Sequence, residues 1–224
     1  MRSNAFRVFA LACCLSAGVA SAGNISFTGT FSHDDQLEIF LFTALSSSFT
    51  AETWSYAGGT NAAGHTIAAG GFDPVLSLFD ASGGLSAISP LVKTNDDGAA
   101  AAIDLTTGNA FDSILTVGTL NAGHTYALVL SENDNLAYGP TYGDGFSQSG
   151  NGDFTAAEFG CSGSGPFCDA GADQRTGNWA VDINGVRSAV DTSAGGTTPE
   201  PGTVPLLTAG LVGLALLRRR RRHV

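Results

Sequence analysis

Two short polar segments of the chain carry the oxygen-bearing side chains that hard metal ions prefer. The first is Asn95-Asp96-Asp97-Gly98 and the second is Glu132-Asn133-Asp134-Asn135. Carboxylate and amide oxygens in loops are typical calcium ligands. The sequence therefore predicts a candidate calcium site formed by Asn95, Asp96, Asp97, Glu132 and Asp134. The same residue types also dominate ordinary turns, and because no EF-hand loop or glycine-rich calcium repeat is present, the turn interpretation stays open.

Aromatic side chains offer a second kind of chemistry, the stacking of sugar rings. Tyr138 and Tyr142 lie in a glycine-rich segment, which makes them candidates for exposed ligand-binding residues. Trp54 and Trp179 lie in alternating apolar segments, which favours positions in the core of the body. A carbohydrate-binding surface built on the two tyrosines is thus one interpretation.

Catalytic motifs are missing from the sequence. There is no G-x-S-x-G nucleophile elbow, no H-E-x-x-H zinc motif and no P-loop. Among so many acidic residues some pair of carboxylates always exists, so such a pair does not indicate a glycoside hydrolase. His33 stands beside two aspartates, but no nucleophile, base and orienting group can be named together. We therefore expect no enzymatic activity.

The C-terminus combines a proline-flanked acid, an apolar run and a basic cluster. Pro199, Glu200 and Pro201 precede an apolar run over residues 204–217, and the basic cluster that follows consists of Arg218, Arg219, Arg220, Arg221 and Arg222. The run has 14 residues, fewer than the roughly 20 that span a bilayer, although arginine side chains can reach the headgroups. By the positive-inside rule the arginines stay in the cytoplasm and the preceding chain lies outside.

This order of features resembles the PEP-CTERM sorting signal of bacterial surface proteins over residues 199–222. The resemblance implies a membrane-embedded exosortase as a partner, which would recognise the tail and cleave near Pro-Glu-Pro. Membrane insertion through the C-terminal helix would be transient if the tail is cleaved and lasting if it is kept. The resemblance predicts a destination and says nothing about activity.

The N-terminus also indicates export. Arg2 and Arg7 precede an apolar stretch over residues 8–20, and Ala20-Ser21-Ala22 supplies the small residues that signal peptidase accepts. The sequence predicts a signal peptide over residues 1–22. We expect the precursor in the inner membrane and the product in the cell envelope, on the cell surface or in the extracellular matrix.

The body between the two ends is strongly acidic. It holds 19 acidic residues against three basic ones, Lys93, Arg175 and Arg187, a formal charge of −16. Such a surface repels nucleic acid and anionic lipid, which argues against both as partners. The charge fits an exterior protein or one that collects divalent cations.

Two cysteines belong to this body, Cys161 and Cys168. An even pair in an exported chain that closes a short flexible loop predicts a disulfide. In the chain-entropy model such a loop stabilises the fold by about 2–3 kcal/mol. The spacing is wider than that of zinc sites, and no histidine lies near it in the sequence.

Short apolar segments with period-two alternation recur along the body, bounded by Gly, Asn or Asp. They cover residues 24–31, 36–43, 49–56, 74–79, 113–117, 125–130 and 178–183. The pattern predicts an all-β fold, an antiparallel β-sandwich or jelly roll over residues 23–190. We expect a hairpin over residues 113–130, a long excursion over residues 143–177, a linker with the Pro-Glu-Pro motif over residues 191–203 and a hydrophobic helix with its arginine tail over residues 204–224.

Part of the body resembles a known module. The segments concerned are Asp73-Pro74-Val75-Leu76-Ser77-Leu78-Phe79-Asp80, Asn95-Asp96-Asp97-Gly98 and Leu120-Asn121-Ala122-Gly123-His124-Thr125-Tyr126. Over about residues 25–131 they are similar to the bacterial pre-peptidase C-terminal module. That resemblance implies a jelly-roll β-sandwich of the kind appended to secreted enzymes, some of which bind calcium or matrix polymers. Residues 154–187 are instead similar to small exported proteins with PEP-CTERM tails and no assigned activity.

The sequence thus predicts an exported, non-catalytic protein of the cell surface or extracellular matrix with a structural or adhesive role. A calcium-dependent carbohydrate-binding module that recognises exopolysaccharide is the alternative. A secreted hydrolase is the third interpretation.

Overall fold

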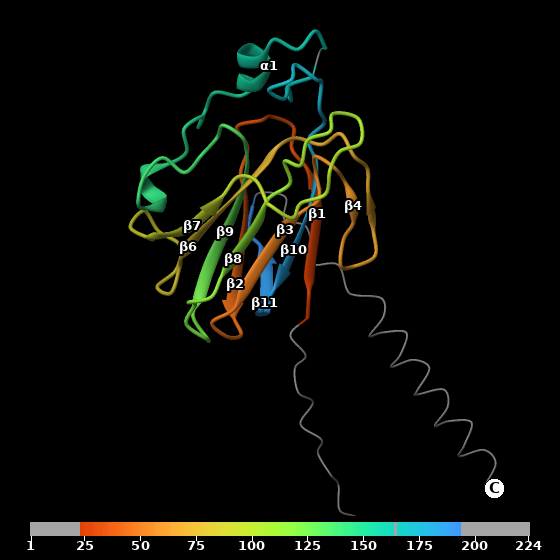
Figure 1. Ribbon diagram of the computed structural model, residues 1–224. Coiled ribbons are helices and arrows are strands. Elements are labelled where there is room, and N and C mark those ends of the chain that lie inside the picture. The colour runs from red at the N-terminus through yellow and green to blue at the C-terminus, as the bar shows by residue number, and fades with distance from the viewer. Residues whose placement is uncertain (1–22, 164, 194–224) are drawn as a thin grey trace, which may run out of the picture.

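A computed structural model describes residues 23–163 and 165–193 of the chain (Figure 1). The described residues form eleven strands, one short α-helix and one 3₁₀ helix. In chain order these are β1 (Ile25–Thr30), β2 (Glu38–Ala44), β3 (Phe49–Thr53), β4 (Gly59–Thr60), β5 (Thr66–Ile67), β6 (Pro74–Asp80), β7 (Leu91–Asn95), β8 (Ile114–Val117), β9 (Thr125–Glu132), η1 (Tyr142–Asp144), α1 (Phe154–Phe159), β10 (Asn178–Asn184) and β11 (Val186–Asp191).

Two antiparallel sheets make up the body. One has the strand order β1-β10-β3-β8 and the other β11-β2-β9-β6-β7, while β4 and β5 form a small ribbon. Figure 1 shows the long strands running side by side, with the loop that carries α1 beyond one end of the sheets. The all-β prediction is confirmed, and the two sheets enclose a shared core as in a β-sandwich.

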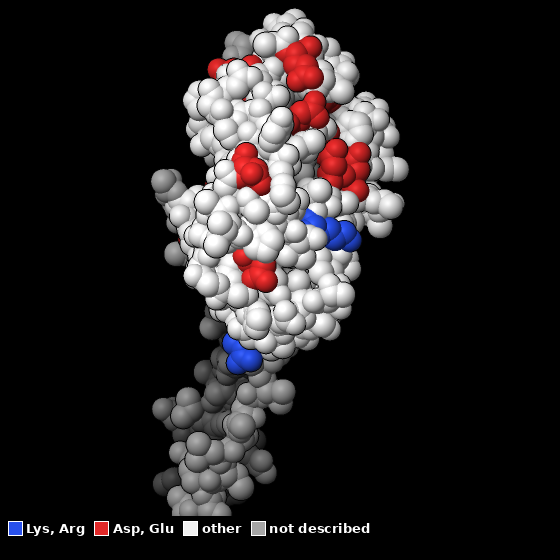
Figure 2. All heavy atoms as spheres, turned by 90° about the vertical axis from the view of Figure 1, so that its left-hand side faces the viewer, with Lys and Arg blue, Asp and Glu red and all other residues white. Residues whose placement is uncertain are grey.

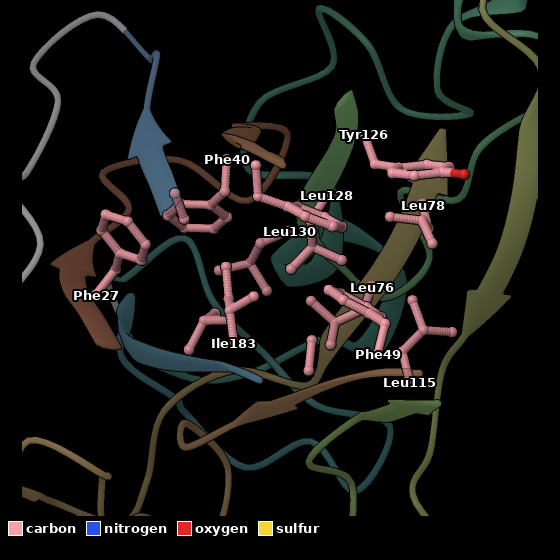
Figure 3. Close-up of a cluster of buried hydrophobic side chains, with 14 of the residues drawn as sticks. Phe27, Phe40, Phe49, Leu76, Leu78, Leu115, Tyr126, Leu128, Leu130 and Ile183 are labelled. Atoms are coloured by element: carbon pink, nitrogen blue, oxygen red, sulfur yellow. The ribbon is translucent and has the colours of Figure 1, made fainter. Parts of the chain in front are cut away.

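The core between the sheets consists mainly of phenylalanine and leucine side chains. On β2, Phe40 and Phe42 are buried whereas Ile39 and Leu41 are only partly buried, as expected for a strand whose side chains alternate between two faces. Phe42 stacks on Phe49 of the opposite sheet, with ring centroids 4.7 Å apart. Figure 3 shows core side chains of both sheets converging on one another, labelled as Phe27, Phe40, Phe49, Leu76, Leu78, Leu115, Tyr126, Leu128, Leu130 and Ile183.

The five-stranded sheet also carries a smaller cluster on its outer face. Phe79 and Val129 point to this face, and Phe146 packs over them from the segment of residues 136–147. That segment folds back on itself, because Tyr138 N–H donates to Gly145 O and Ser147 N–H donates to Leu136 O, each over 2.9 Å. β6 and β9 are consequently buried on both faces, and this explains their nearly continuous apolar sequences.

The expected hairpin over residues 113–130 is wrong. β8 pairs with β3 in one sheet, while β9 pairs with β2 and β6 in the other. The connecting segment crosses between the sheets, held by the backbone bonds Leu120 N–H to Ser47 O and Gly123 N–H to Ala44 O. Turn residues mark where a strand stops, but they do not specify which distant strand the next one joins.

Besides the two-residue strands β4 and β5, two longer strands were not predicted from the sequence, β7 and β11. Both lie at the edges of the five-stranded sheet and have mixed burial. An edge strand has only one partner and exposes much of its length, so its apolar alternation is weak. The sequence pattern that reveals central strands is therefore faint at both edges.

The excursion over residues 143–177 contains α1 and the disulfide. Cys161 and Cys168 are bonded, with their Cα atoms 5.8 Å apart, so the predicted disulfide is confirmed. Within the described part of the chain, no helix is long and apolar enough to cross a membrane. The expected signal helix and C-terminal hydrophobic helix lie outside the described residues.

Candidate functional site

Three carboxylates converge where β6 begins and β7 ends. Asp73 immediately precedes β6, while Asp96 and Asp97 immediately follow β7. The two strands are antiparallel neighbours with Leu76 opposite Asn95, so the start of one meets the end of the other. One carboxylate oxygen from each acid lies within 4.8 Å of the others. We call Asp73, Asp96 and Asp97 the acidic centre.

The end of β9 adds further oxygen donors behind this centre. Pro74 pairs with Glu132 across β6 and β9, and Asn133 N–H donates to Asp73 O over 2.9 Å. The Asn133 side-chain Nδ2 also lies 3.4 Å from Asp73 Oδ2. The two polar segments singled out from the sequence thus meet, with Asp73 between them.

The predicted metal ligands do not all take the same position. Asp96 and Asp97 belong to the acidic centre, Glu132 is fully buried beside Asp73, and Asp134 lies close enough to raise the pKa of Asp96. Asn95 holds the loop in shape, because its Nδ2 donates to Asp97 O over 3.0 Å and its Oδ1 accepts from Ile114 N–H over 2.9 Å.

Asp73 was not predicted as a ligand. The available signal was an aspartate directly before a strand, in Asp73-Pro74. It becomes informative only once β7, which ends in two more aspartates, is known to be the neighbour of that strand.

The acids of this region raise one another's pKa. Burial raises the pKa of Asp73 to about 9, and the charges of Asp96 and Asp97 add to the effect. Burial also raises the pKa of Asp96 to about 6, with Asp97 and Asp134 contributing. The pKa of Glu132 lies well above its usual range because of burial and the nearby charge of Asp73. The region therefore favours the uptake of positive charge, as a proton or as a metal ion.

Several oxygens of this region have no hydrogen-bond donor. Among the described residues, five buried side-chain nitrogen or oxygen atoms lack a partner, and three of them are Asp73 Oδ1, Glu132 Oε2 and Asn133 Oδ1. Native proteins rarely leave buried polar atoms unpaired, and such a group requires an explanation. Three unpaired acceptors together indicate a missing donor or cation.

A second group of buried charges lies around Arg175. Its guanidinium donates to Asp104 Oδ2 from both Nη1 and Nη2 over 3.1 Å, and to Gly71 O from Nε over 2.9 Å. The same group lies 3.6 Å above the ring centroid of Tyr56, whose hydroxyl donates to Asp169. We call Arg175, Asp104, Asp169 and Tyr56 the arginine centre.

Electrostatics in the arginine centre differ from those in the acidic centre. Burial acts to raise the pKa of Asp104, but hydrogen bonds from Thr106 and Arg175 outweigh it and lower that pKa. Asp104 and Arg175 lie 71 residues apart in the chain. No local sequence pattern pointed to this pair.

Asp80, Ser82 and His124 meet at an exposed turn. Ser82 Oγ donates to Asp80 Oδ1 over 2.5 Å and lies 3.0 Å from His124 Nδ1. In a catalytic triad the acid orients the histidine, which in turn receives the serine proton. Here the acid binds the serine directly, and these bonds lower the pKa of Asp80. The order of contacts is that of a structural turn.

The structure places the two candidate tyrosines differently. The Tyr138 residue is 77% exposed, whereas Tyr142 packs edge-on against Phe79 with centroids 5.5 Å apart. Trp179 is buried in the core, and Trp54 is half-buried with its Nε1 donating to Asp182 over 2.8 Å. Ligand binding by the tyrosines stays a prediction, and Tyr138 is the more accessible of the two.

Comparison with known proteins identifies the C-terminal segment. Residues 197–222 match the family model of the PEP-CTERM protein-sorting motif. The match covers Pro199, Glu200, Pro201 and the arginine cluster, all outside the described residues. No curated protein matches the chain.

Among solved structures, the chain matches the crystal structure of the Yersinia pseudotuberculosis-derived mitogen. The sequence identity is 12% and the TM-score 0.36, and the match covers 75% of this chain and 89% of that one. The sorting motif indicates that the protein is exported and that an exosortase directs it to the cell envelope or surface.

Proposed function

We propose that this chain is a non-catalytic component of the cell surface or extracellular matrix with a structural or adhesive role. The observation that carries the proposal is the sorting motif at residues 197–222, which follows an all-β body. Such a motif directs the protein that carries it out of the cell. The body is then the part that acts there.

The acidic surface of the body supports an exterior role. Figure 2 shows acidic side chains spread over one face of the molecule, with few basic ones among them. Two of the three basic residues of the body, Lys93 and Arg187, lie on edge strands, and Arg175 is enclosed in the arginine centre. The body therefore repels nucleic acid and anionic lipid.

The polar clusters of the body support a role without catalysis. The buried aspartates of the arginine centre bind Arg175 and neighbouring N–H and O–H groups. The serine at Ser82 is held by Asp80 without a histidine relay. Each arrangement serves to hold loops in place.

In this proposal, signal peptidase removes residues 1–22 and the sorting enzyme cleaves near Pro199-Glu200-Pro201. The body would be a sandwich of the pre-peptidase C-terminal type. Carbohydrate binding is the second candidate function, which the exposure of Tyr138 favours. Exopolysaccharide would then be its ligand.

The test is the intact mass of the protein from the envelope and the medium of its native host. We expect a chain that starts after Ala22 and ends near Pro199 to Pro201, outside the inner membrane. Replacement of all five residues Arg218–Arg222 by glutamine should leave the uncleaved precursor in the membrane. A wild-type chain that keeps residues 204–224 would overturn release into the matrix and indicate a membrane-tethered protein.

Cosedimentation of the same protein with insoluble polysaccharides separates the two candidate roles. Sugar binding that Tyr138→Ala abolishes and Tyr142→Phe preserves would favour the carbohydrate-binding module. Absence of cosedimentation would leave the structural role.

A further inference from the structure

We propose that the acidic centre binds one calcium ion through Asp73, Asp96 and Asp97, and that this ion ties the start of β6 to the end of β7. The inference does not depend on the surface role proposed above. It explains why the carboxylates of the acidic centre have no positively charged partner within the described part of the protein.

The spacing of the three carboxylates fits a single ion. Calcium binds six to eight oxygens at about 2.3–2.6 Å, so two oxygens on one ion lie at most about 5 Å apart. The carboxylate oxygens of the acidic centre lie within 4.8 Å of one another. Asn133, whose Nδ2 lies 3.4 Å from Asp73 Oδ2, carries a further buried oxygen without a donor, Oδ1. Water would complete the coordination shell, as it does in many calcium sites.

The donor set selects a hard cation. All three acids offer oxygen, and no histidine or cysteine belongs to the group among the described residues. Zinc prefers nitrogen and sulfur ligands, and magnesium requires a nearly regular octahedron and usually retains several waters. Three carboxylates from two loops form the kind of irregular, charge-rich site that calcium accepts.

An independent observation separates this centre from an ordinary acidic patch. Glu132 is only 1% exposed and its Oε2 has no partner. Asp73 Oδ1 is likewise buried without a partner. These oxygens lie where a positive charge is needed, and neither finds a donor in the protein.

Other buried aspartates of the body do not share this deficiency. Asp112 accepts hydrogen bonds from Thr53 Oγ1 and from the N–H groups of Ser55, Tyr56 and Ala57. Asp34 accepts from Phe154 N–H, Thr155 N–H and Thr155 Oγ1 at the start of α1. Where this fold buries an aspartate for structure, it supplies donors. The unpaired oxygens at Asp73 therefore indicate an external partner.

The loop that carries Asp96 and Asp97 is held in place before any ion binds. Ser113 Oγ donates to Asn95 O over 2.9 Å and also to Asp96 O, and Gly98 N–H donates to Asp112 O over 3.0 Å. A Cβ atom at Gly98 would lie 2.7 Å from Ile114 Cγ1, so the close approach requires glycine. Such preorganisation lowers the ordering that binding would otherwise require.

The three lysine and arginine side chains of the body are bound or placed elsewhere. Lys93 donates to Thr116 O over 2.8 Å, and Arg175 is bound to Asp104 in the arginine centre. Arg187 lies on β11, at the opposite edge of the sheet from β7. Among the described residues, no ion pair joins a lysine or arginine to the acidic centre, so we expect its positive charge to come from solution.

Calorimetry and thermal unfolding of the full-length chain in mild detergent test the proposal. With CaCl₂ we expect one ion bound per chain and a melting temperature about 5–10 °C above that in EGTA, for an ion concentration near 100 Kd. Asp73→Asn should abolish both responses. Glu158→Gln removes one charge from the exposed face of α1 and should leave both unchanged.

Asp97→Asn provides a second variant that changes an exposed carboxylate, in case Asp73→Asn fails to fold. A loss of calcium binding in Asp97→Asn, with the fold kept, would support the site. No calcium response in the wild type, or an equal response in Asp73→Asn and Glu158→Gln, would overturn the proposal. An equal response to MgCl₂ would overturn the assignment to calcium.

Discussion

The arginine centre and the acidic centre bury carboxylates in two different ways. In the first, Asp104 and Asp169 lie beside Arg175, and the pKa of Asp104 falls below its ordinary value. In the second, Asp73 lies beside two more acids, and its pKa rises to about 9. Both centres lie in loops, but only the arginine centre contains its own positive charge.

The two centres differ in where the counter-charge of their buried carboxylates comes from. A guanidinium within the chain makes the arginine centre independent of the solution, because its geometry includes the counter-charge. The acidic centre lacks one and depends on a proton or a cation from outside. The stability of one region should therefore respond to mutation alone, and that of the other to solution conditions as well.

The largest effect should come from Arg175→Leu. This change leaves Asp104 and Asp169 buried without their partner, and breaking a buried ion pair costs about 3–5 kcal/mol of unfolding free energy. Chemical denaturation with calcium present measures the loss. Arg187→Leu, on the exposed side of β11, is the matched control and should cost less than about 1 kcal/mol.

A double variant sharpens this prediction. Adding Asp104→Asn to Arg175→Leu removes the stranded charge, so part of the lost stability should return. If Arg175→Leu costs no more than Arg187→Leu, the arginine centre contributes no more than a surface pair and the comparison fails.

The next effect should come from Asp73→Asn in the presence of EGTA. Because this carboxyl is buried near two like charges, its neutral replacement should stabilise the calcium-free protein by about 1–3 kcal/mol. Asp112→Asn should do the opposite and cost about 1–3 kcal/mol, since Asn cannot accept all four bonds that Asp112 receives. Parallel urea titrations compare the two. Destabilisation by both changes would show that Asp73 is satisfied without a cation.

The smallest effect should appear at Glu38, where protonation removes the negative charge of the half-buried carboxylate. Burial raises its pKa to about 7 from an ordinary value of 4.5, and a hydrogen bond with Asp191 on the neighbouring strand contributes. The folded state thus holds this proton more tightly than the unfolded state. Its contribution to stability is complete below about pH 4.5 and is lost as the pH rises through about 7.

Glu38→Gln should remove this dependence. Compared with wild type, the variant should gain about 1–2 kcal/mol at pH 8, allowing for solvent screening of a half-buried group, and show little difference at pH 4. Urea unfolding at both pH values gives the comparison. An equal difference at the two pH values would rule out titration of Glu38 as the cause.

Much of the fold could be predicted from local patterns. Alternation over residues 36–43 predicted a strand there, and in β2 Phe40 and Phe42 share the buried face. The export context and spacing of Cys161 and Cys168 indicated the disulfide that the structure contains. These predictions succeed because strand faces and short covalent loops involve residues that are close in the chain.

Candidate site residues were predicted less completely. Asp96 and Asp97 stood out because acids adjacent in sequence are visible as a cluster. Asp73 did not, because it reaches them only through the pairing of β6 with β7. The hairpin expected over residues 113–130 was wrong for the same reason, because β8 pairs with β3 and β9 pairs with β6, both distant in the chain.

By itself, the sequence determined the class of fold, the acidic character, the disulfide and the sorting tail, because each depends on composition or on near neighbours along the chain. Only the tertiary structure decided that Arg175 would neutralise Asp104 and that Asp73 would lack such a partner. The physical reason is sheet register: which strand ends meet is set by hydrogen-bonded pairing and core packing between distant segments. That pairing therefore determines which charged side chains lie next to one another at the strand ends.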